Sequence, residues 1–318
     1  MSKQGIVFMG TPEFAVATLN ALIDGGHDVR AVVTAPDRPA GRGRQLKASA
    51  VKERALELGL RILQPERLKA PEFLAELDAL DAALYVVVAF RMLPEVVWTK
   101  PTLGTVNLHG SLLPAYRGAA PINWAVMNGE SRTGVTTFLI QHTIDTGDVL
   151  LQETTPIGPD ETAGDLHDRL MAIGAKLMVR TVDGLFTGTL TGTPQDFDSN
   201  APPPSAPKLD TTNTRIRFDR PLQAVHDQVR GLSPYPGAWC KWTDPTGTNL
   251  HCKLLRSTAT TGPAAGSPGT IHLRGEQLTV SCSDGELRIL DLQLEGRKRM
   301  STNDFLRGSR NVEGTVLT

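Results

Sequence analysis

The chain has 318 residues, of which 40% are hydrophobic and 21% are charged, and its formal net charge is −1. This length suits two domains, and the composition is typical of a folded globular protein rather than a disordered one. The sequence shows no signal peptide and no apolar run approaching the roughly 20 residues that cross a bilayer, so we expect a cytoplasmic protein without membrane association.

Cysteine usage excludes two further classes of protein. The three cysteines, Cys240, Cys252 and Cys282, are odd in number and lack Cys-x-x-Cys spacing. We therefore expect buried free thiols rather than a disulfide framework or a structural zinc site. No other set of residues predicts a metal site.

The first half of the chain alternates the patterns of strands and helices. One helical segment, for example, begins near Pro12 and ends near Gly25. The apolar run at 82–89 is typical of a parallel sheet covered on both faces. The sequence therefore predicts an α/β, Rossmann-like domain with a parallel sheet and active residues at the carboxyl ends of its strands. The expected strands are 6–9, 29–34, 82–89, 105–108 and 135–140, and the expected helices are 12–25, 51–58 and 162–186.

A change of composition after residue 186 predicts a domain boundary. Residues 187–207 are rich in Thr, Gly, Pro and Ser, which predicts a linker without packed elements. Beyond it, a helical segment at 222–230 precedes short alternating strands such as 250–255 and 277–280. We therefore predict a catalytic domain at 1–186, a linker at 187–207, and a smaller β-barrel of oligonucleotide-binding (OB) type at 208–318.

The charge is unevenly distributed along the chain. Residues 205–318 hold 15 Lys and Arg against 11 Asp and Glu, a net charge of +4, and the remainder carries −5. This distribution permits polyanion binding by the C-terminal part.

Three polar residues form the most informative pattern. Asn107 and His109 are two apart on an expected strand, so their side chains emerge on the same side. Asp145 follows the next expected strand. If the strand ends are neighbours, an amide, an imidazole and a carboxylate converge, which is the set that acyl transfer needs for oxyanion binding and proton handling. A structural Asn-x-His and an ordinary Asp-containing turn remain the alternatives at this point.

These three residues belong to longer motifs. The segment Asn107–Pro121 reads Asn-Leu-His-Gly-Ser-Leu-Leu-Pro-Ala-Tyr-Arg-Gly-Ala-Ala-Pro, and it resembles the 10-formyltetrahydrofolate-dependent formyltransferases. The resemblance covers nearly the full length, with further matches at Met9–Ala15, Pro36–Gly43, Asp145–Asp148, Ala206–Lys208 and Leu232–Gly237.

The resemblance implies roles for individual residues. Asn107, His109 and Asp145 match the family's catalytic residues, and Ser111, Leu112, Leu113 and Pro114 match its tetrahydrofolate-binding segment. It also implies direct transfer from 10-formyltetrahydrofolate, without a metal, to an amine that attacks as the free base. Asn107 would bind the developing oxyanion, His109 would add positive charge, and Asp145 would place a negative charge beside His109.

A basic loop and the second domain favour one acceptor, methionine carried on initiator tRNA. The loop at 36–47 carries Arg38, Arg42, Arg44 and Lys47 against one acid, Asp37. Taken alone it is typical of a solvated surface loop, but by the resemblance it matches a loop that inserts into the tRNA acceptor stem. The C-terminal domain would give the RNA a second surface, and we expect the protein to be a monomer.

Other acceptors and functions stay open. The same fold and catalytic residues would serve a formyltransferase of a small-molecule amine or a formyltetrahydrofolate hydrolase. An RNA-binding protein with a degenerate formyltransferase domain is a further alternative, but it predicts the loss of catalytic residues that are present here. One departure from the family also occurs: Phe90 and Arg91 replace the Tyr and Gly common at a strand end beside the folate pocket.

Overall fold

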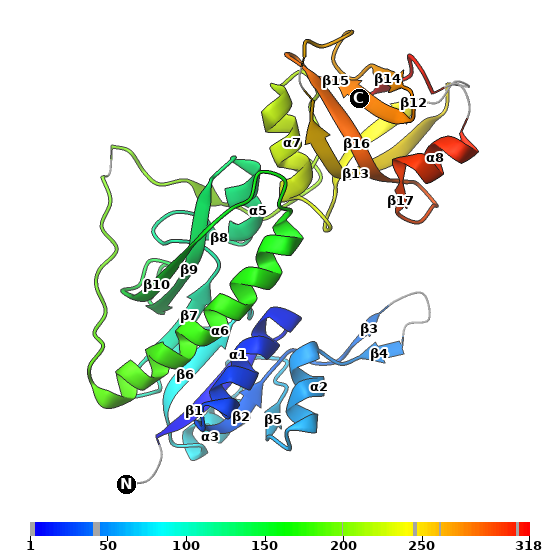
Figure 1. The fold of residues 1–318 in the computed structure, drawn as a ribbon. Coiled ribbons are helices and arrows are strands. Elements are labelled where there is room, and N and C mark those ends of the chain that lie inside the picture. The colour runs from blue at the N-terminus through cyan, green and yellow to red at the C-terminus, as the bar shows by residue number, and fades with distance from the viewer. Residues whose placement is uncertain (1–3, 41–44, 199, 244–246, 261, 310–311) are drawn as a thin grey trace. The chain divides into compact units, whose positions relative to one another are not determined.

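The computed structural model describes residues 4–40, 45–198, 200–243, 247–260, 262–309 and 312–318. The chain forms two compact units (Figure 1). Each unit is assembled from several segments of the chain, so the units do not test the domain bounds predicted at 186 and 208. Those bounds stay a prediction. The first unit comprises Met1–Arg117, Gly134–Thr155 and His167–Pro204, and the second comprises Gly118–Thr133, Pro156–Leu166 and Ser205–Thr318.

A seven-stranded sheet forms the centre of the first unit, in the order β10-β9-β7-β6-β1-β2-β5. The pairs from β7 to β5 are parallel, which confirms the predicted α/β class. The sheet is mostly rather than wholly parallel, because β9 returns antiparallel to β7, a direction that the sequence did not indicate. The strands are β1 (Gly5–Gly10), β2 (Asp28–Val33), β5 (Ile62–Leu63), β6 (Ala82–Val88), β7 (Thr105–His109), β9 (Arg132–Leu139) and β10 (Val149–Pro156).

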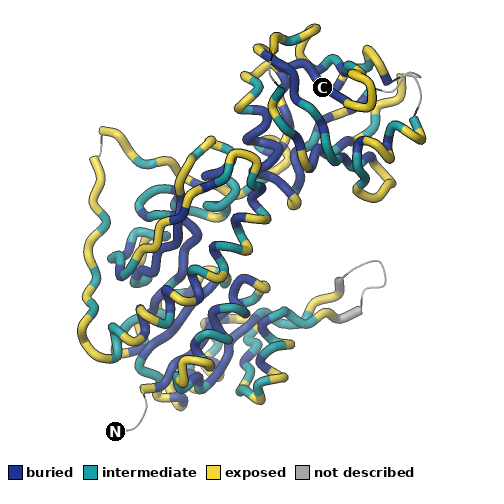
Figure 2. The backbone as a smooth tube through the Cα atoms, viewed as in Figure 1, coloured by how far each residue is buried: buried dark blue, intermediate teal, exposed yellow. Residues whose placement is uncertain are grey.

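Burial on both faces explains the apolar strands. Val7 and Met9 of β1 belong to a core that also contains Phe73 of α3, whereas the alternate residues Ile6 and Phe8 are fully buried on the other face. Figure 2 shows the inner strands of this sheet as continuously buried. The helices are α1 (Glu13–Asp24), α2 (Ala50–Glu57), α3 (Pro71–Ala79), α4 (Glu95–Trp98) and α6 (Ala163–Thr187).

An antiparallel barrel forms the core of the second unit. Its strands follow the order β14-β15-β16-β13-β12-β18, and a bridge between Thr270 and Val316 closes the sheet from β18 back toward β14. This closure agrees with the predicted β-barrel. The strands are β12 (Ala238–Thr243), β13 (Asn249–Ala259), β14 (Ile271–Arg274), β15 (Gln277–Ser281), β16 (Glu286–Leu294) and β18 (Val316–Leu317), and β17 (Met300–Ser301) pairs with β16.

The remaining elements of the chain are short. The helices are α5 (Pro121–Met127), α7 (Leu222–Gly231) and α8 (Thr302–Gly308), and β8 (Arg117–Gly118) pairs with β11 (Ser205–Ala206). The three cysteines are free and buried, as predicted. Burial raises the pKa of the Cys282 thiol to about 12, so it is not a nucleophile at neutral pH. No helix among the described residues has the length and apolarity needed to cross a membrane.

Buried polar contacts fix the segment before α6 against α7 within the second unit. Arg230 donates to Asp227 at 2.7 Å and to the carbonyl oxygens of Gly158 and Glu161 at 3.2 Å each. Arg230 is 5% exposed and Asp227 is 4% exposed, so their charges compensate each other in a dry environment. His226 also lies in this region, with Nε2 at 3.2 Å from Oδ1 of Asp160.

Candidate active site

Asn107 and His109 lie at the carboxyl-terminal end of β7, and as alternate strand residues they share one face of the sheet. The backbone of Asn107 pairs with Val87 of β6 and Phe138 of β9, so the strand is held from both sides. Within the described part of the chain, the side-chain amide of Asn107 makes no hydrogen bond, and the residue is only half-buried. Its N–H groups are therefore available to an oxygen atom outside the protein.

The imidazole of His109 is buried between two oxygen atoms. Nε2 lies 2.8 Å from the carbonyl oxygen of Tyr116, and Nδ1 lies 3.8 Å from Oδ2 of Asp145. The ring of Phe138 packs edge-on against it, with 6.4 Å between centroids. A carbonyl and a carboxylate accept hydrogen bonds but do not donate, so both ring nitrogens of His109 face acceptor oxygens. The 3.8 Å separation is an ion-pair distance rather than a hydrogen bond.

Asp145 reaches His109 from the loop between β9 and β10. The residue adopts a left-handed backbone conformation with φ of 55°, which Asp tolerates better than most residues, and its side chain is 13% exposed. The structure thus brings together the imidazole and the carboxylate that the sequence singled out. Asp145 lies beyond the end of β9 at Leu139, so its place depends on the loop rather than on the strand itself.

Sequence reasoning missed two residues that hold this loop. The side-chain amide of Gln195 donates to the carbonyl oxygens of Asp145 at 2.9 Å and Gly147 at 2.7 Å. Its oxygen accepts two hydrogen bonds from Arg117, at 2.6 and 3.1 Å. Burial lowers the pKa of the Arg117 guanidinium, while the Asp145 carboxylate acts in the opposite direction. Arg117 was visible within the matching motif, but nothing in the Thr- and Pro-rich segment around Gln195 indicated a contact.

The segment Ser111–Pro114 follows β7 directly, and side chains of the neighbouring strands β9 and β10 hold its backbone. The Thr136 hydroxyl donates to the carbonyl oxygen of Ser111 and accepts from the amide of Leu113. Gln152 donates to the carbonyl oxygen of Leu113 at 2.8 Å. The side chains of Ser111 and Leu113 are buried, whereas Leu112 and Pro114 are half-buried. A ligand beside this segment can therefore contact Leu112, Pro114 and exposed backbone, but not the other two side chains.

The departure at Phe90 and Arg91 has a structural explanation. Arg91 donates to the carbonyl oxygens of Pro65 and Glu66, so it links the chain after β6 to the chain after β5. Its guanidinium lies 5.7 Å from the centroid of the Phe90 ring, and its Nε is buried without a partner among the described residues. Burial is the main cause that lowers its pKa, and the charge of Arg38 adds to the effect. Arg91 thus ties the end of β6 to the end of β5 through two backbone carbonyls.

The basic loop forms a hairpin of β3 (Arg38–Ala40) and β4 (Gln45–Lys47). Arg38 and Lys47 are exposed and lie directly opposite each other in the ladder, which is an unfavourable placement for two cations without a counter-charge. Asp37 does not provide that charge, because it is bound by Lys52 and Gln64, and these contacts lower its pKa. The predicted contacts Arg42 and Arg44 lie outside the described residues.

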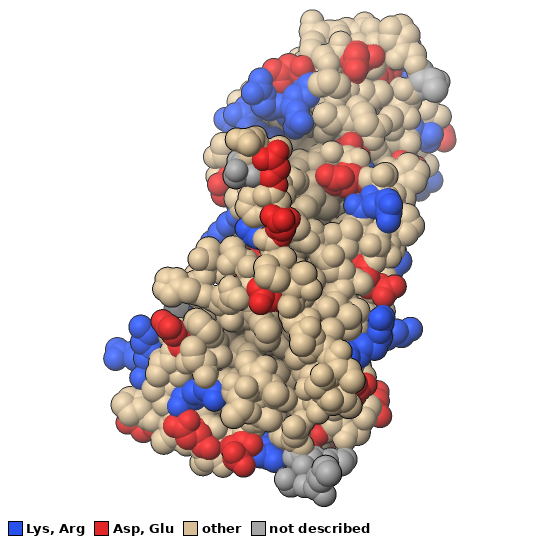
Figure 3. Space-filling model, turned by 90° about the vertical axis from the view of Figure 1, so that its left-hand side faces the viewer, with Lys and Arg blue, Asp and Glu red and all other residues tan. Residues whose placement is uncertain are grey.

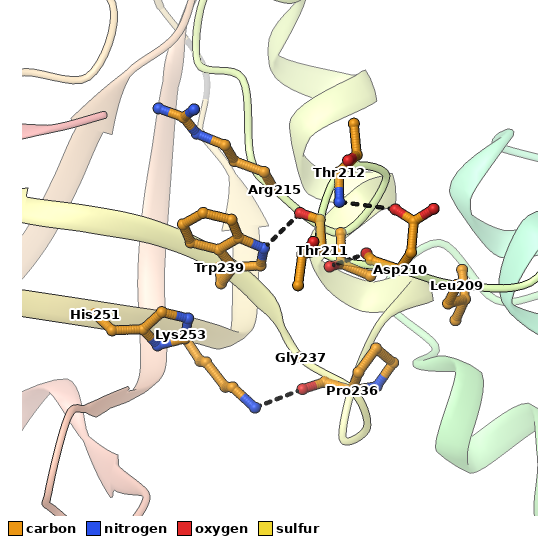
Figure 4. Close-up of a pocket in the computed structure, with 11 residues that line it drawn as sticks. Leu209, Asp210, Thr211, Thr212, Arg215, Pro236, Gly237, Trp239, His251 and Lys253 are labelled. Atoms are coloured by element: carbon orange, nitrogen blue, oxygen red, sulfur yellow. Dashed lines mark hydrogen bonds between the residues drawn. The ribbon is translucent and has the colours of Figure 1, made fainter.

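The second unit contains a cavity of about 730 Å³ (Figure 4). Trp239 stacks on His251 with centroids 5.2 Å apart, and Arg215 lies 5.6 Å from the centre of the Trp239 ring. Lys253 points to the carbonyl oxygen of Pro236, 2.8 Å away. Aromatic rings combined with cations are suited to flat or anionic groups.

Surface charges of both signs are mixed. On the face of the molecule shown in Figure 3, basic and acidic side chains are interspersed.

Potential metal ligands are not clustered in the described ranges: no group of three His, Cys, Asp or Glu side chains there could hold an ion. The groups that the structure brings together at the carboxyl-terminal end of β7 are an imidazole and a carboxylate, those of His109 and Asp145.

Known proteins resemble the chain along its whole length. A formyl transferase family model matches residues 3–182, and a model of the formyl transferase C-terminal domain matches residues 208–310. The methionyl-tRNA formyltransferase of Parabacteroides distasonis is 48% identical over 311 residues, covering 96% of each chain. That of Pelobacter propionicus is 47% identical and covers all of this chain and 97% of its own.

Solved structures share the fold at low identity. A sugar 3N-formyl transferase, WlaRD, with dTDP and 5-N-formyl-THF present, has a TM-score of 0.67 at 18% identity, covering 94% of this chain and all of its own. HypX from Aquifex aeolicus in complex with tetrahydrofolic acid has a TM-score of 0.64 at 17% identity, covering 98% of this chain and 50% of its own. From the two family models and the end-to-end relatives, the chain belongs to the formyl transferase family, among the methionyl-tRNA formyltransferases.

Proposed function

We propose that the chain transfers the formyl group of 10-formyltetrahydrofolate to the α-amino group of methionine on initiator tRNA. The observation that carries the chemical part is the convergence of His109 and Asp145 on the strand end that also bears Asn107. The acceptor rests on the full-length similarity to methionyl-tRNA formyltransferases. The product, N-formylmethionyl-tRNA, would serve translation initiation in the cytoplasm.

Transfer forms one carbon–nitrogen bond and breaks another. The methionyl amine attacks the formyl carbon as the free base, and the formyl oxygen gains negative charge. Asn107 donates a hydrogen bond to that oxygen, and the charge of His109 stabilises it further. As the bond between the formyl carbon and N10 of the folate breaks, the proton lost by the amine is delivered to N10. The formyl carbon keeps its oxidation state, so the transfer needs no redox partner.

Asp145 has two roles in this proposal. Its negative charge, 3.8 Å from Nδ1, stabilises the positive His109 ring. The carboxylate also offers an acceptor through which the proton of the attacking amine can pass. Because Nε2 is already engaged by the Tyr116 carbonyl, the ring can rotate little, and the charge is held in one place.

The folate donor is proposed to bind beside Ser111, Leu112, Leu113 and Pro114. This segment follows the Asn107 and His109 strand directly, so a donor that contacts it presents its formyl group near those side chains. The rigid attachment of the segment through Thr136 and Gln152 favours a preformed site.

Two basic surfaces support a tRNA acceptor. The cross-strand cations Arg38 and Lys47 are suited to phosphate groups, and Arg42 and Arg44 belong to the same proposed contact. The cavity of the second unit, with Trp239, His251 and Arg215, offers a surface of the kind that single-stranded RNA uses. We propose that the protein acts on the tRNA as a monomer.

An acceptor assay tests the function. Formyl transfer from 10-formyltetrahydrofolate is measured with methionylated initiator tRNA, methionylated elongator tRNA and a small-molecule amine, glycinamide ribonucleotide, in competition. The proposal expects rapid formylation of the initiator tRNA. Transfer only to the small molecule would retain the catalytic residues but replace the acceptor, and donor hydrolysis without transfer would indicate a hydrolase.

A further inference from the structure

The side-chain amide of Gln195 makes four hydrogen bonds, two as donor and two as acceptor. Its nitrogen donates to the carbonyl oxygens of Asp145 and Gly147, and its oxygen accepts from Nε and one terminal nitrogen of Arg117. An amide can donate two hydrogen bonds and accept two, so the group is fully engaged. All of these residues lie in the first unit.

We propose that Gln195 is a positioning residue of the formyl-transfer site, which fixes the Asp145 carboxylate against His109 through the backbone of the Asp145 loop. The assignment rests on the proposed function, because it requires that Asp145 takes part in transfer. It gives a positioning role to a residue of the segment 187–207, whose composition predicts only a linker.

The loop needs an external support because its conformation is not the intrinsic preference of the chain. Asp145 has φ of 55°, a region that a non-glycine residue occupies at a cost. Gln195 donates one hydrogen bond to the carbonyl oxygen of Asp145 itself and one to that of Gly147, two residues further along the loop. Gln195 therefore stabilises the left-handed turn at the place where the carboxylate departs toward His109.

The backbone around Gln195 is itself fixed to the same loop. Thr193 and Val149 exchange both backbone hydrogen bonds, each at 2.8 Å, as an antiparallel bridge. At Gly192, an added Cβ would lie 2.6 Å from the Cβ of Asp148, so this approach requires glycine. The segment 192–195 thus lies against residues 145–149 through main-chain and side-chain contacts together.

Arg117 anchors the other end of the amide. Its guanidinium holds the Gln195 oxygen with two hydrogen bonds and lies 5.2 Å from the centroid of the Phe197 ring. This fixes which end of the amide faces the carbonyls of the loop. A charged donor also makes the hydrogen bonds stronger than those between neutral groups.

A matched pair of variants separates the two ends of the amide. Gln195→Glu keeps the shape and the acceptor for Arg117, but it removes both N–H donors and places a carboxylate oxygen against two carbonyls. Gln195→Ala removes all four hydrogen bonds. Asp196→Ala, at the exposed neighbouring position, is the control for the segment. Each variant is compared with the unsubstituted chain. The quantities measured are kcat, KM for the donor and for methionyl-tRNA, and the temperature of thermal melting.

We expect both Gln195 variants to lower kcat by roughly 10- to 100-fold, because misplacement by about 1 Å has costs of this size. KM for both substrates and the melting temperature should stay close to those of Asp196→Ala. In an Asp145→Asn background, Gln195→Ala should have little further effect, because residues that act through one another are not additive.

The outcomes distinguish this assignment from the proposed function. If the unsubstituted chain does not formylate methionyl-tRNA, the proposed function has failed. Suppose that the unsubstituted chain formylates methionyl-tRNA and that Asp145→Asn is impaired. A Gln195→Glu variant with full kcat would then overturn the role assigned to Gln195 and leave the proposed function intact. If Gln195→Ala lowers kcat by the same factor in the unsubstituted chain and in the Asp145→Asn background, the assignment is overturned as well.

Discussion

The Nδ1 atom of His109 lies 3.8 Å from Oδ2 of Asp145, while Nε2 of the same ring lies 2.8 Å from the carbonyl oxygen of Tyr116. Both neighbours are acceptors, and the ring belongs to a residue that is 6% exposed. The imidazole is therefore held between two acceptor oxygens on the strand end that also bears Asn107.

The Asp145 carboxylate is expected to matter through its charge. Asp145→Asn keeps the size of the side chain but removes the charge that balances the His109 ring, and we expect kcat to fall by about 100-fold. Steady-state kinetics at saturating donor and methionyl-tRNA measure the effect. Asp148→Asn, on the same loop, serves as the comparison, and equal losses in both variants would contradict a specific role of Asp145.

The β3–β4 hairpin is expected to bind phosphates without reading sequence. Arg38→Ala and Lys47→Ala should each weaken tRNA binding and reduce the slope of log affinity against log salt by about 1. Binding titrations at several salt concentrations give the slopes. Arg61→Ala, an exposed residue paired with Glu76, should leave the slope unchanged. Slopes unaffected by the hairpin variants would argue against phosphate contacts there.

Arg230 is expected to be essential for the stability of the second unit. Arg230→Ala leaves the buried Asp227 carboxylate with a hydrogen bond from Gln223 but without a cation, which costs about 3–5 kcal/mol of unfolding free energy. Urea unfolding gives the value. Arg307→Ala removes an exposed pair with Asp304 and should change it by about 0.5 kcal/mol or less. An Arg230 variant as stable as the Arg307 variant would disprove the buried-pair account.

A capping box at the start of α6 predicts a pH effect. The Thr162 hydroxyl donates to the Asp165 carboxylate at 2.7 Å and the Thr162 amide donates to it at 3.1 Å, and these bonds lower the pKa of Asp165 below 3.8. The Asp165 amide in turn donates to the Thr162 hydroxyl oxygen. A lowered pKa stabilises the fold above pH 3.8, and this stabilisation is lost as the pH falls through the lowered pKa.

The Asp165→Asn variant isolates this contribution. Its stability deficit relative to the unsubstituted chain should be largest near neutral pH and should shrink as the pH falls below 3.8. Thr162→Ala should cost about 1 kcal/mol at neutral pH as the loss of a helix cap. Unfolding free energies across the acid range test both expectations. A deficit for Asp165→Asn that is independent of pH would contradict the charge-based account.

The sequence predicts local elements well because their signals are local. The apolar run of β6 and the proline before α1 both lie where the structure has those elements, within one or two residues. The antiparallel direction of β9 was missed, because it depends on which edge of the sheet the chain returns to. Alternating apolar residues do not encode that direction.

The catalytic set was predictable only in part. Spacing two apart on a strand placed Asn107 and His109 on one face, but the contact of Asp145 with His109 depends on a left-handed loop residue. The support from Gln195 joins positions 50 residues apart. Composition indicated a linker there, because a Pro- and Thr-rich segment carries no periodic signal even when individual side chains pack.

The most direct test of the central claim is the single-turnover rate of formyl transfer by Asn107→Ala, with donor and methionyl-tRNA saturating. If Asn107 binds the developing oxyanion, the rate should fall by roughly 100- to 1,000-fold while the affinity for the donor is retained. A rate equal to that of the unsubstituted chain would remove Asn107 from the reaction and contradict the mechanism proposed for this site.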